Sequence, residues 1–118
     1  MTDYTIFHNP RCSKSRQTLA LLEENGVTPS IVKYLEDTPD ATALKALIDK
    51  LGLDKAHDLV RNKEGDYKTA GLSKDSSDED VINAMVQYPK LIERPIVVRG
   101  DKAVLGRPPE NVLTLLGK

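Results

Sequence analysis

The first 35 residues follow a strand, helix, strand order, and this order limits the folds open to the chain more than any other feature. Tyr4–Phe7 is a short β-type run that Asn9-Pro10 ends, and residues 13–24 are predicted to form a helix that Asn25-Gly26 closes. Residues 31–35 give a second predicted strand. Because a helix separates the two strands, we expect them to run parallel through a right-handed crossover, as a βαβ unit.

The middle of the chain is predicted to be helical. Thr38-Pro39 is typical of a helix start, since proline is favoured at the first helical position. Four apolar residues then follow the i, i+3, i+4, i+7 spacing of one helix face: Leu44, Leu47, Ile48 and Leu51. Residues 54–60 indicate a shorter helix, the polar stretch 62–76 a surface loop, and residues 78–88 a further helix.

The last part of the chain predicts a hairpin and a helix. Pro95–Arg99 and Lys102–Leu105 flank Gly100-Asp101, a dipeptide suited to a type II′ turn between antiparallel strands. Pro108-Pro109 then opens a final helix. The order β-α-β, a helical insertion at about residues 39–88, and β-β-α predicts an α/β, thioredoxin-like fold with a mixed four-stranded sheet.

The size and charge of the chain narrow its class. Its 118 residues are expected to form one domain, residues 1–118. Seventeen basic residues nearly balance eighteen acidic ones, so the net charge of −1 gives no general reason to bind nucleic acid or an anionic membrane. No segment approaches the length of a membrane span, and the N-terminus lacks the features of a signal peptide. We therefore expect a cytoplasmic protein.

The metal-ligating residues are few. One cysteine and two histidines, His8 and His57, give no zinc-type cluster at usable spacing, so we expect no structural metal. Carboxylate-based metal binding stays open.

Cys12 is the single cysteine, and it stands where the first strand leads into the first helix. Unpaired backbone N–H groups and the helix dipole favour a thiolate at such a position, as would the nearby Arg11, Lys14 and Arg16 if their side chains reached the sulfur. The alternative is that Cys12 is a small buried apolar residue. The neighbouring residues favour a nucleophile.

Two polar residues flank this cysteine. His8 could pair with the sulfur or transfer a proton, and it could equally be a hydrogen-bonding cap at the end of the strand. Ser15 could place its hydroxyl near the sulfur across the first helical turn, or it could bond to the backbone there. Both residues are candidates for the catalytic site.

The spacing around Cys12 separates two familiar thiol chemistries. A dithiol redox centre needs Cys-x-x-Cys, but the fourth position here is Ser15, so a second thiol must come from outside the chain. A low-molecular-weight phosphatase loop needs an arginine six residues after the cysteine, where this chain has Thr18. The phosphatase hypothesis therefore loses its best signature.

Several separated motifs resemble the glutaredoxin-linked arsenate reductases and their thioredoxin-fold relatives, in particular a shorter branch of that family. In chain order, these motifs are His8-Asn9-Pro10-x-Cys12-x-x-Ser15-Arg16-x-Thr18-Leu19, Tyr34-Leu35 followed by Thr38-Pro39, Arg61, Arg94-Pro95-Ile96-Val97-Val98 and Gly106-Arg107-Pro108-Pro109-Glu110. The resemblance spans nearly the whole chain.

The resemblance implies a site and a reaction. Cys12 would attack arsenate, and three arginines, Arg61, Arg94 and Arg107, would hold the oxyanion, for which the guanidinium fork is well suited. Arg11, Lys14 and Arg99 are better explained as solvated charges. The resemblance also implies a cis bond between Arg94 and Pro95.

No tightly bound cofactor is implied. Glutathione would be the co-substrate, and a glutaredoxin would supply the second thiol and release arsenite. Two alternatives remain at this level: a glutathione-dependent thiol transferase, and a partner-binding transcriptional regulator, since a related branch of thioredoxin-fold proteins consists of regulators that bind RNA polymerase. The regulators typically carry Cys-x-x-Cys, which the serine at position 15 does not match.

Overall fold

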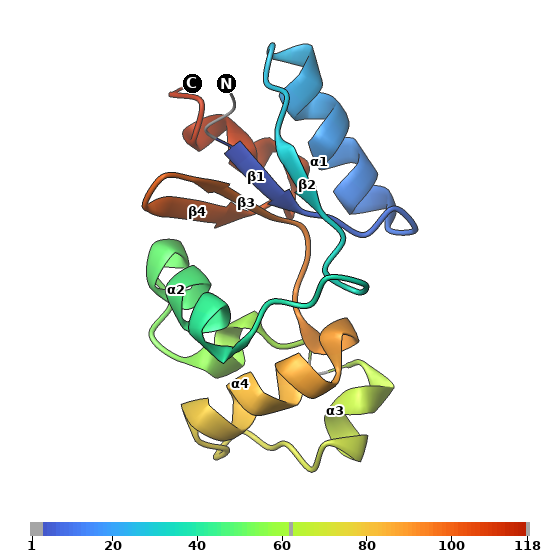
Figure 1. Cartoon of the computed structure of the whole chain (residues 1–118), viewed down its shortest axis with the longest axis vertical. Coiled ribbons are helices and arrows are strands. Elements are labelled where there is room, and N and C mark those ends of the chain that lie inside the picture. Colours follow the sequence, from blue (N-terminus) through green and yellow to red (C-terminus); the bar gives the residue numbers. More distant parts are fainter. Residues whose placement is uncertain (1–3, 62, 118) are drawn as a thin grey trace. The chain divides into compact units, whose positions relative to one another are not determined.

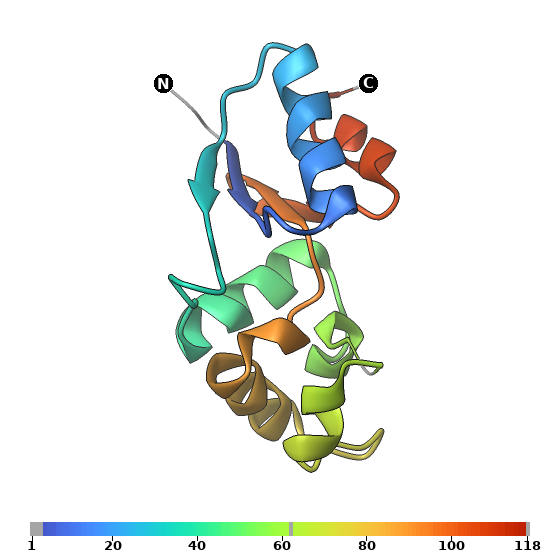
Figure 2. The ribbon, with the colours of Figure 1, turned by 90° about the vertical axis from the view of Figure 1, so that its right-hand side faces the viewer.

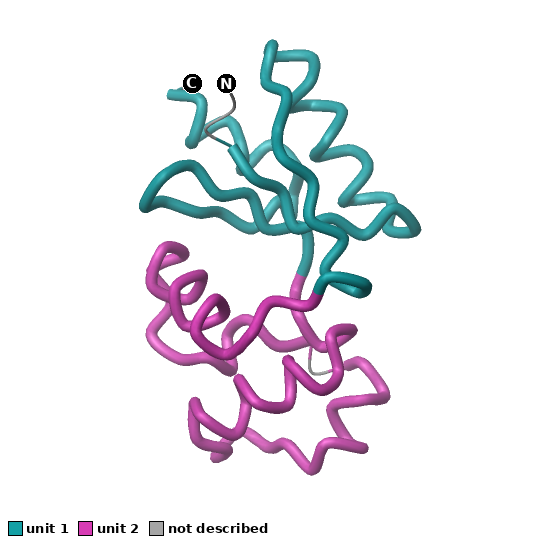
Figure 3. The backbone as a smooth tube through the Cα atoms, viewed as in Figure 1, with its two compact units in different colours: residues 1–37, 94–118 teal, residues 38–93 magenta. Residues whose placement is uncertain are grey.

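The computed structural model describes residues 4–61 and 63–117. It forms two compact units, coloured separately in Figure 3. Residues 1–37 and 94–118 make up a sheet unit, and residues 38–93 make up a helical unit. The predicted helical insertion at 39–88 therefore extends to residue 93. The expectation that the whole chain is one domain stays a prediction.

The sheet unit contains the four predicted strands, β1 (Tyr4–Phe7), β2 (Ser30–Val32), β3 (Ile96–Arg99) and β4 (Lys102–Leu105). Their order is β2-β1-β3-β4, with β2 parallel to β1 and the other two pairings antiparallel. Helix α1 (Ser13–Glu24) connects β1 to β2 and completes the predicted βαβ unit (Figure 1). The mixed sheet and the parallel pairing of β1 with β2 are confirmed.

The core of the sheet unit lies between one face of the sheet and two helical segments. Helix α1 packs against η3 (Pro109–Thr114), a 3₁₀ segment, and Figure 2 shows the two side by side. The buried residues of this core come from both ends of the chain: Ile6, Leu22, Val97, Val112 and Leu115. Arg99 was expected to be a solvated charge. It is exposed, but its guanidinium lies 5.3 Å from the centre of the Tyr4 ring and donates to the Leu115 carbonyl at 2.6 Å.

The helical unit contains α2 (Ala41–Leu51), η1 (Ala56–Leu59), α3 (Gly65–Thr69), α4 (Asp78–Gln87) and η2 (Pro89–Leu91). Its buried apolar residues come mainly from α2, η1 and α4: Leu44, Leu47, Ile48, Leu59, Val81, Ile82 and Met85. An isolated antiparallel bridge joins Val60, which precedes α3, to Ile92, which follows η2. The stretch of chain that contains α3, α4 and η2 therefore begins and ends at the same place. The predicted face of α2 is thus the buried one.

Five predicted elements differ in detail. The helix expected to start at Thr38-Pro39 starts at Ala41, because the carboxylate of Asp40 caps it. The second strand covers 30–32 rather than 31–35, and Lys33 begins a turn in which its carbonyl accepts from the N–H groups of Glu36 and Asp37. The segment 54–60 is a 3₁₀ turn, and the last helix is also 3₁₀. The loop expected at 62–76 contains α3; Asn62 lies outside the described residues.

Candidate functional site

Cys12 is the residue that begins α1. Its backbone is extended, with φ −93° and ψ 124°, and its carbonyl oxygen accepts the N–H of Arg16 at 3.0 Å, the first bond of the helix. Its own N–H donates to the carbonyl of Asn9 at 3.0 Å, which closes a turn between β1 and the helix. The half-buried thiol therefore stands at the N-terminal end of a twelve-residue helix, as predicted.

Several groups act on the charge of this thiol. Burial raises the pKa of Cys12, because a half-buried sulfur loses part of the water that would solvate its negative charge. The backbone N–H of Ser15, the charge and hydrogen bond of Arg94, and the backbone N–H of Lys14 all act in the opposite direction. Together they hold the pKa of the thiol below its ordinary value, which favours the nucleophilic thiolate.

His8 and Ser15 form a buried pair next to the cysteine turn. His8 follows β1 and is only 6% exposed, and its Nδ1 lies 2.6 Å from the Ser15 hydroxyl oxygen. That oxygen also accepts the N–H of Asn9 at 3.0 Å, so its proton is free to be donated to Nδ1. Of the two sequence alternatives for His8, the structure shows a hydrogen-bonding role; proton transfer stays a prediction.

The imidazole of His8 is kept neutral by its surroundings. Burial lowers the pKa of His8, and the positive charges of Lys33 and Arg16 lower it further. A neutral ring can accept the Ser15 proton at Nδ1, whereas a charged ring cannot. The neutral ring is thus the form that can accept the Ser15 proton in this hydrogen bond.

Arg94 and Arg107 lie next to each other although β3 and β4 separate them in the sequence. Arg94 interacts with the Cys12 sulfur, and its Nε and Nη1 atoms are buried. Arg107 is exposed, and its Nη1 lies 3.5 Å from the carbonyl oxygen of Arg94. The Arg94-Pro95 bond is cis, as predicted, and Arg107-Pro108 is also cis, which the sequence analysis did not anticipate.

Thr18 and Gly106 were not predicted as site residues, but they connect α1 to the segments that carry Arg94 and Arg107. Thr18 is fully buried on α1, and its Oγ1 lies 3.2 Å from the carbonyl oxygen of Gly106. The N–H of Gly106 donates to the carbonyl of Pro95 at 2.9 Å. The sequence does carry a signal for Thr18, which shares the buried face of α1 with Ser15 and Leu22. A threonine on the core face of a helix needs a hydrogen-bond partner.

Arg61, the third arginine of the predicted oxyanion site, belongs to the helical unit. Its Nη1 lies 3.3 Å from a carboxylate oxygen of Glu64, and its Nε lies 3.9 Å from one of Glu93. All three side chains are about one quarter exposed. Its place in the same site as Cys12 stays a prediction.

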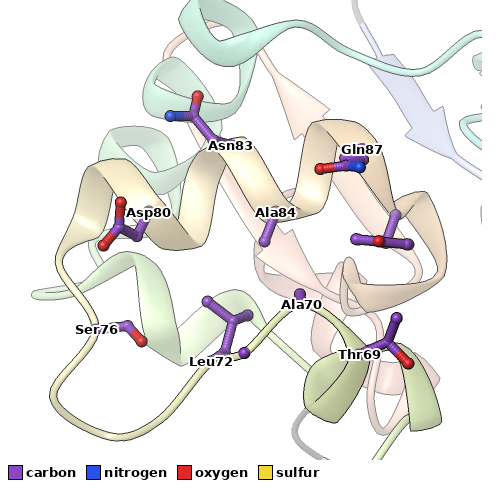
Figure 4. A pocket seen from close by; sticks show the side chains of 10 residues that line it. Thr69, Ala70, Leu72, Ser76, Asp80, Asn83, Ala84 and Gln87 are labelled. Carbon is purple, nitrogen blue, oxygen red and sulfur yellow. The ribbon is translucent and has the colours of Figure 1, made fainter.

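The helical unit also has a cavity of about 300 Å³. Figure 4 shows the mostly polar side chains around it, which come from the end of α3, the segment between α3 and α4, α4 itself and Tyr88 directly after it. None of the predicted site residues lines this cavity. Within residues 4–61 and 63–117, no group of three His, Cys, Asp or Glu side chains is arranged to hold a metal ion. No helix of the described chain has the length and apolar character that a membrane span requires.

Known proteins resemble this chain closely along its length. It is 56% identical over 113 residues to the uncharacterized protein YfgD of Escherichia coli K12, covering 95% of both chains. It is 47% identical over 117 residues to an arsenate reductase of Neisseria meningitidis serogroup B, covering 98% of this chain and all of the relative. A solved arsenate reductase from Vibrio cholerae superposes with a TM-score of 0.91 and is 50% identical, covering 94% of this chain and 95% of that one.

The fold and the sequence point to the same group of proteins. The sheet order, the helical insertion and the solved relative identify the fold as thioredoxin-like, as predicted. The family model described as the ArsC family matches residues 7–115, which include Cys12 and the three arginines. The chain belongs to the ArsC family.

Proposed function

We propose that this protein is an arsenate reductase in which Cys12 is the nucleophile and the only catalytic thiol of the chain. The observation that carries the proposal is the contact of Arg94 with a thiol whose pKa is lowered at the start of α1. A thiolate held beside a guanidinium is suited to attack an atom that carries several negative oxygens, because the cation offsets the repulsion. The names of the Neisseria and Vibrio relatives support arsenate as that substrate.

Arginines would hold the arsenate oxygens during this attack. Arg94 and Arg107 are the two candidates in the sheet unit, and the proximity of Arg107 to the Arg94 carbonyl supports their joint action. Arg61 is the third candidate, and its carboxylate partners Glu64 and Glu93 would compete with the bound oxyanion for its guanidinium. His8 and Ser15 would keep the turn that presents the sulfur in its attacking position.

The reaction requires two electrons that one thiol cannot supply. The Cys12 thiolate forms a sulfur–arsenic bond, and one arsenate oxygen leaves as water after protonation. Glutathione replaces a second oxygen on arsenic, again with loss of water. A glutaredoxin thiol then attacks the glutathione sulfur, so that the electron pair of that sulfur–arsenic bond stays on arsenic and reduces it. Water finally displaces Cys12 and releases arsenite.

A coupled assay tests the proposal. Glutaredoxin, glutathione, glutathione reductase and NADPH are incubated with the protein, and arsenate-dependent NADPH consumption is recorded. We expect turnover with the wild type, none with Cys12→Ser, and a severe loss with Arg94→Lys, because a lysine ammonium lacks the planar fork. Arg99→Lys, at the other end of β3, should retain activity.

A parallel reaction with a glutathionylated peptide distinguishes the main alternative. Turnover of the peptide without any arsenate-dependent reaction would replace the proposal with a thiol transferase. Turnover of arsenate by Cys12→Ser would exclude the covalent mechanism. Failure on both substrates, with capture of RNA polymerase subunits from an extract, would favour the regulator.

A further inference from the structure

The contact between Thr18 and Gly106 joins two segments that are far apart in the sequence. Thr18 Oγ1 lies 2.8 Å from the carbonyl oxygen of Lys14, one turn earlier in α1, and 3.2 Å from that of Gly106. A helical threonine often bonds only to the carbonyl four residues before it. Thr18 has that acceptor and a second one across the core, and its side chain is fully buried.

Gly106 permits this approach because it has no side chain. A Cβ at this position would lie 2.6 Å from Thr18 Oγ1 and 2.8 Å from Pro95 Cγ, well inside van der Waals contact. Gly106 is not among the glycines with positive φ, so the backbone conformation does not require a glycine. Close packing requires it instead, between α1 on one side and Pro95 on the other.

The same contact connects the segments that carry three groups of the proposed site, all of them in the sheet unit. Cys12 begins the helix that carries Thr18. Arg94 directly precedes Pro95, whose carbonyl accepts the N–H of Gly106, and Arg107 directly follows Gly106. Any displacement of Gly106 from Thr18 therefore changes the position of both arginines relative to the thiol.

We propose that Thr18 and Gly106 are positioning residues for the reaction of Cys12, because their contact sets the distance from the thiol to Arg94 and Arg107. The inference rests on the proposed function and names two residues that act through others, without touching the substrate. The interaction between two charges changes steeply at short separation, and small displacements in a catalytic site cost large factors in rate.

Three substitutions separate this role from simple packing. Thr18→Val keeps the shape of the side chain and removes the hydroxyl, so the Gly106 carbonyl loses its contact. Thr18→Ser keeps the hydroxyl and removes the methyl group. Gly106→Ala adds the Cβ that the structure cannot accommodate without movement. Thr69→Val is the matched control, because Thr69 makes the same type of bond to the carbonyl four residues before it but is exposed.

The experiment is the pH dependence of Cys12 alkylation by iodoacetamide, with circular dichroism to establish that each variant is folded. We expect the midpoint to rise in Thr18→Val and in Gly106→Ala, and to stay at the wild-type value in Thr18→Ser and Thr69→Val. Well below the midpoint, the alkylation rate falls about tenfold for each unit of such a rise. KM for arsenate should increase in the same two variants.

An unchanged midpoint in both Thr18→Val and Gly106→Ala would overturn the inference, as would a Thr18→Ser midpoint equal to that of Thr18→Val. If Thr18→Val or Gly106→Ala does not fold, the other of these two variants is sufficient for the test. Alkylation needs no arsenate, so a wild-type protein that fails to reduce arsenate would reject the proposed function and still give a clear result for Thr18 and Gly106.

Discussion

The charge on the Cys12 sulfur depends on donors of two kinds, which differ in what a mutation can remove. The N–H groups of Ser15 and Lys14 belong to the backbone of α1, so they remain whatever side chains those positions carry. The guanidinium of Arg94 is a side chain and supplies both a charge and a hydrogen bond. Arg94 is therefore the residue through which the reactivity of the thiol can be tested.

Replacement of Arg94 by glutamine should raise the pKa of Cys12 toward that of an ordinary thiol, about 8.5. Glutamine keeps hydrogen-bond donors but loses the positive charge that favours the thiolate. The measurement is the pH profile of iodoacetamide alkylation, which reports on one site because Cys12 is the only cysteine. Arg99→Gln is the control and should leave the profile unchanged; equal profiles for Arg94→Gln and the wild type would contradict the assignment.

The helices are stabilised at their ends as well as along their buried faces. Helix α2 begins at Asp40, whose carboxylate accepts the N–H of Ala43 at 2.8 Å. It ends at Gly52 in the left-handed region, with φ 71°, which a residue without Cβ adopts most easily. Ser77 similarly accepts the N–H of Asp80 at the start of α4.

Asp40→Ala should destabilise the protein by about 1 kcal/mol, the usual cost of losing an N-cap. The Ala43 N–H then loses its side-chain acceptor, and the helix dipole loses a nearby negative charge. Urea denaturation followed by circular dichroism measures the change. Thr42→Ala, in the exposed first turn of the same helix, should be close to neutral; a similar loss in both variants would argue against a specific capping effect.

The elements that could be predicted from the sequence are those whose side chains repeat with a clear period or whose ends carry a local signal. The face of α2 and the Gly100-Asp101 hairpin are of this kind; Gly100 has φ 61° while Asp101 does not have a positive φ, as a type II′ turn requires. Helix α3 has no buried residue, so no apolar period marked it. Tyr34 lies in a turn and is buried. Its apolar ring was read as part of a strand, so the predicted strand is longer than β2.

The final helical segment was predicted from its Pro108-Pro109 start, which does not distinguish an α-helix from a 3₁₀ helix. Its buried residues Pro109 and Val112, and Leu115 directly after it, are spaced by three, which is the period of a 3₁₀ helix. The candidate site divides in the same way. Cys12 at a helix start is a local feature, and it was predictable. The approach of Gly106 to Thr18 is a tertiary contact, which no local pattern specifies.

For the molecule as a whole, the two units should unfold together, as the single-domain prediction requires. Leu59 is fully buried in the helical unit, and Leu59→Ala should cost roughly 2–5 kcal/mol, through lost transfer free energy and the cavity left behind. Far-UV circular dichroism reports on α2 and α4 of the helical unit together with α1 of the sheet unit, while the reactivity of Cys12 in denaturant reports on the sheet unit alone. We expect both midpoints to fall by the same amount.

One control variant and one contrary outcome complete this test. Val97→Ala, in the buried centre of the sheet unit, destabilises that unit directly and should lower both unfolding midpoints as well. Separate transitions in Leu59→Ala, with Cys12 still protected after a first part of the helical signal is lost, would show instead that the chain consists of two independently stable domains.

The sheet unit is built from both ends of the chain, and this has a consequence for synthesis. Strand β1 pairs with β3, which follows the whole helical unit in the sequence. Chains are made from the N-terminus, so Cys12 leaves the ribosome long before Arg94. The whole helical unit, residues 38–93, is also made before Arg94. The nascent thiol lacks its guanidinium neighbour during that interval. Its full reactivity is therefore acquired only after Arg94 and the strands β3 and β4 have been made.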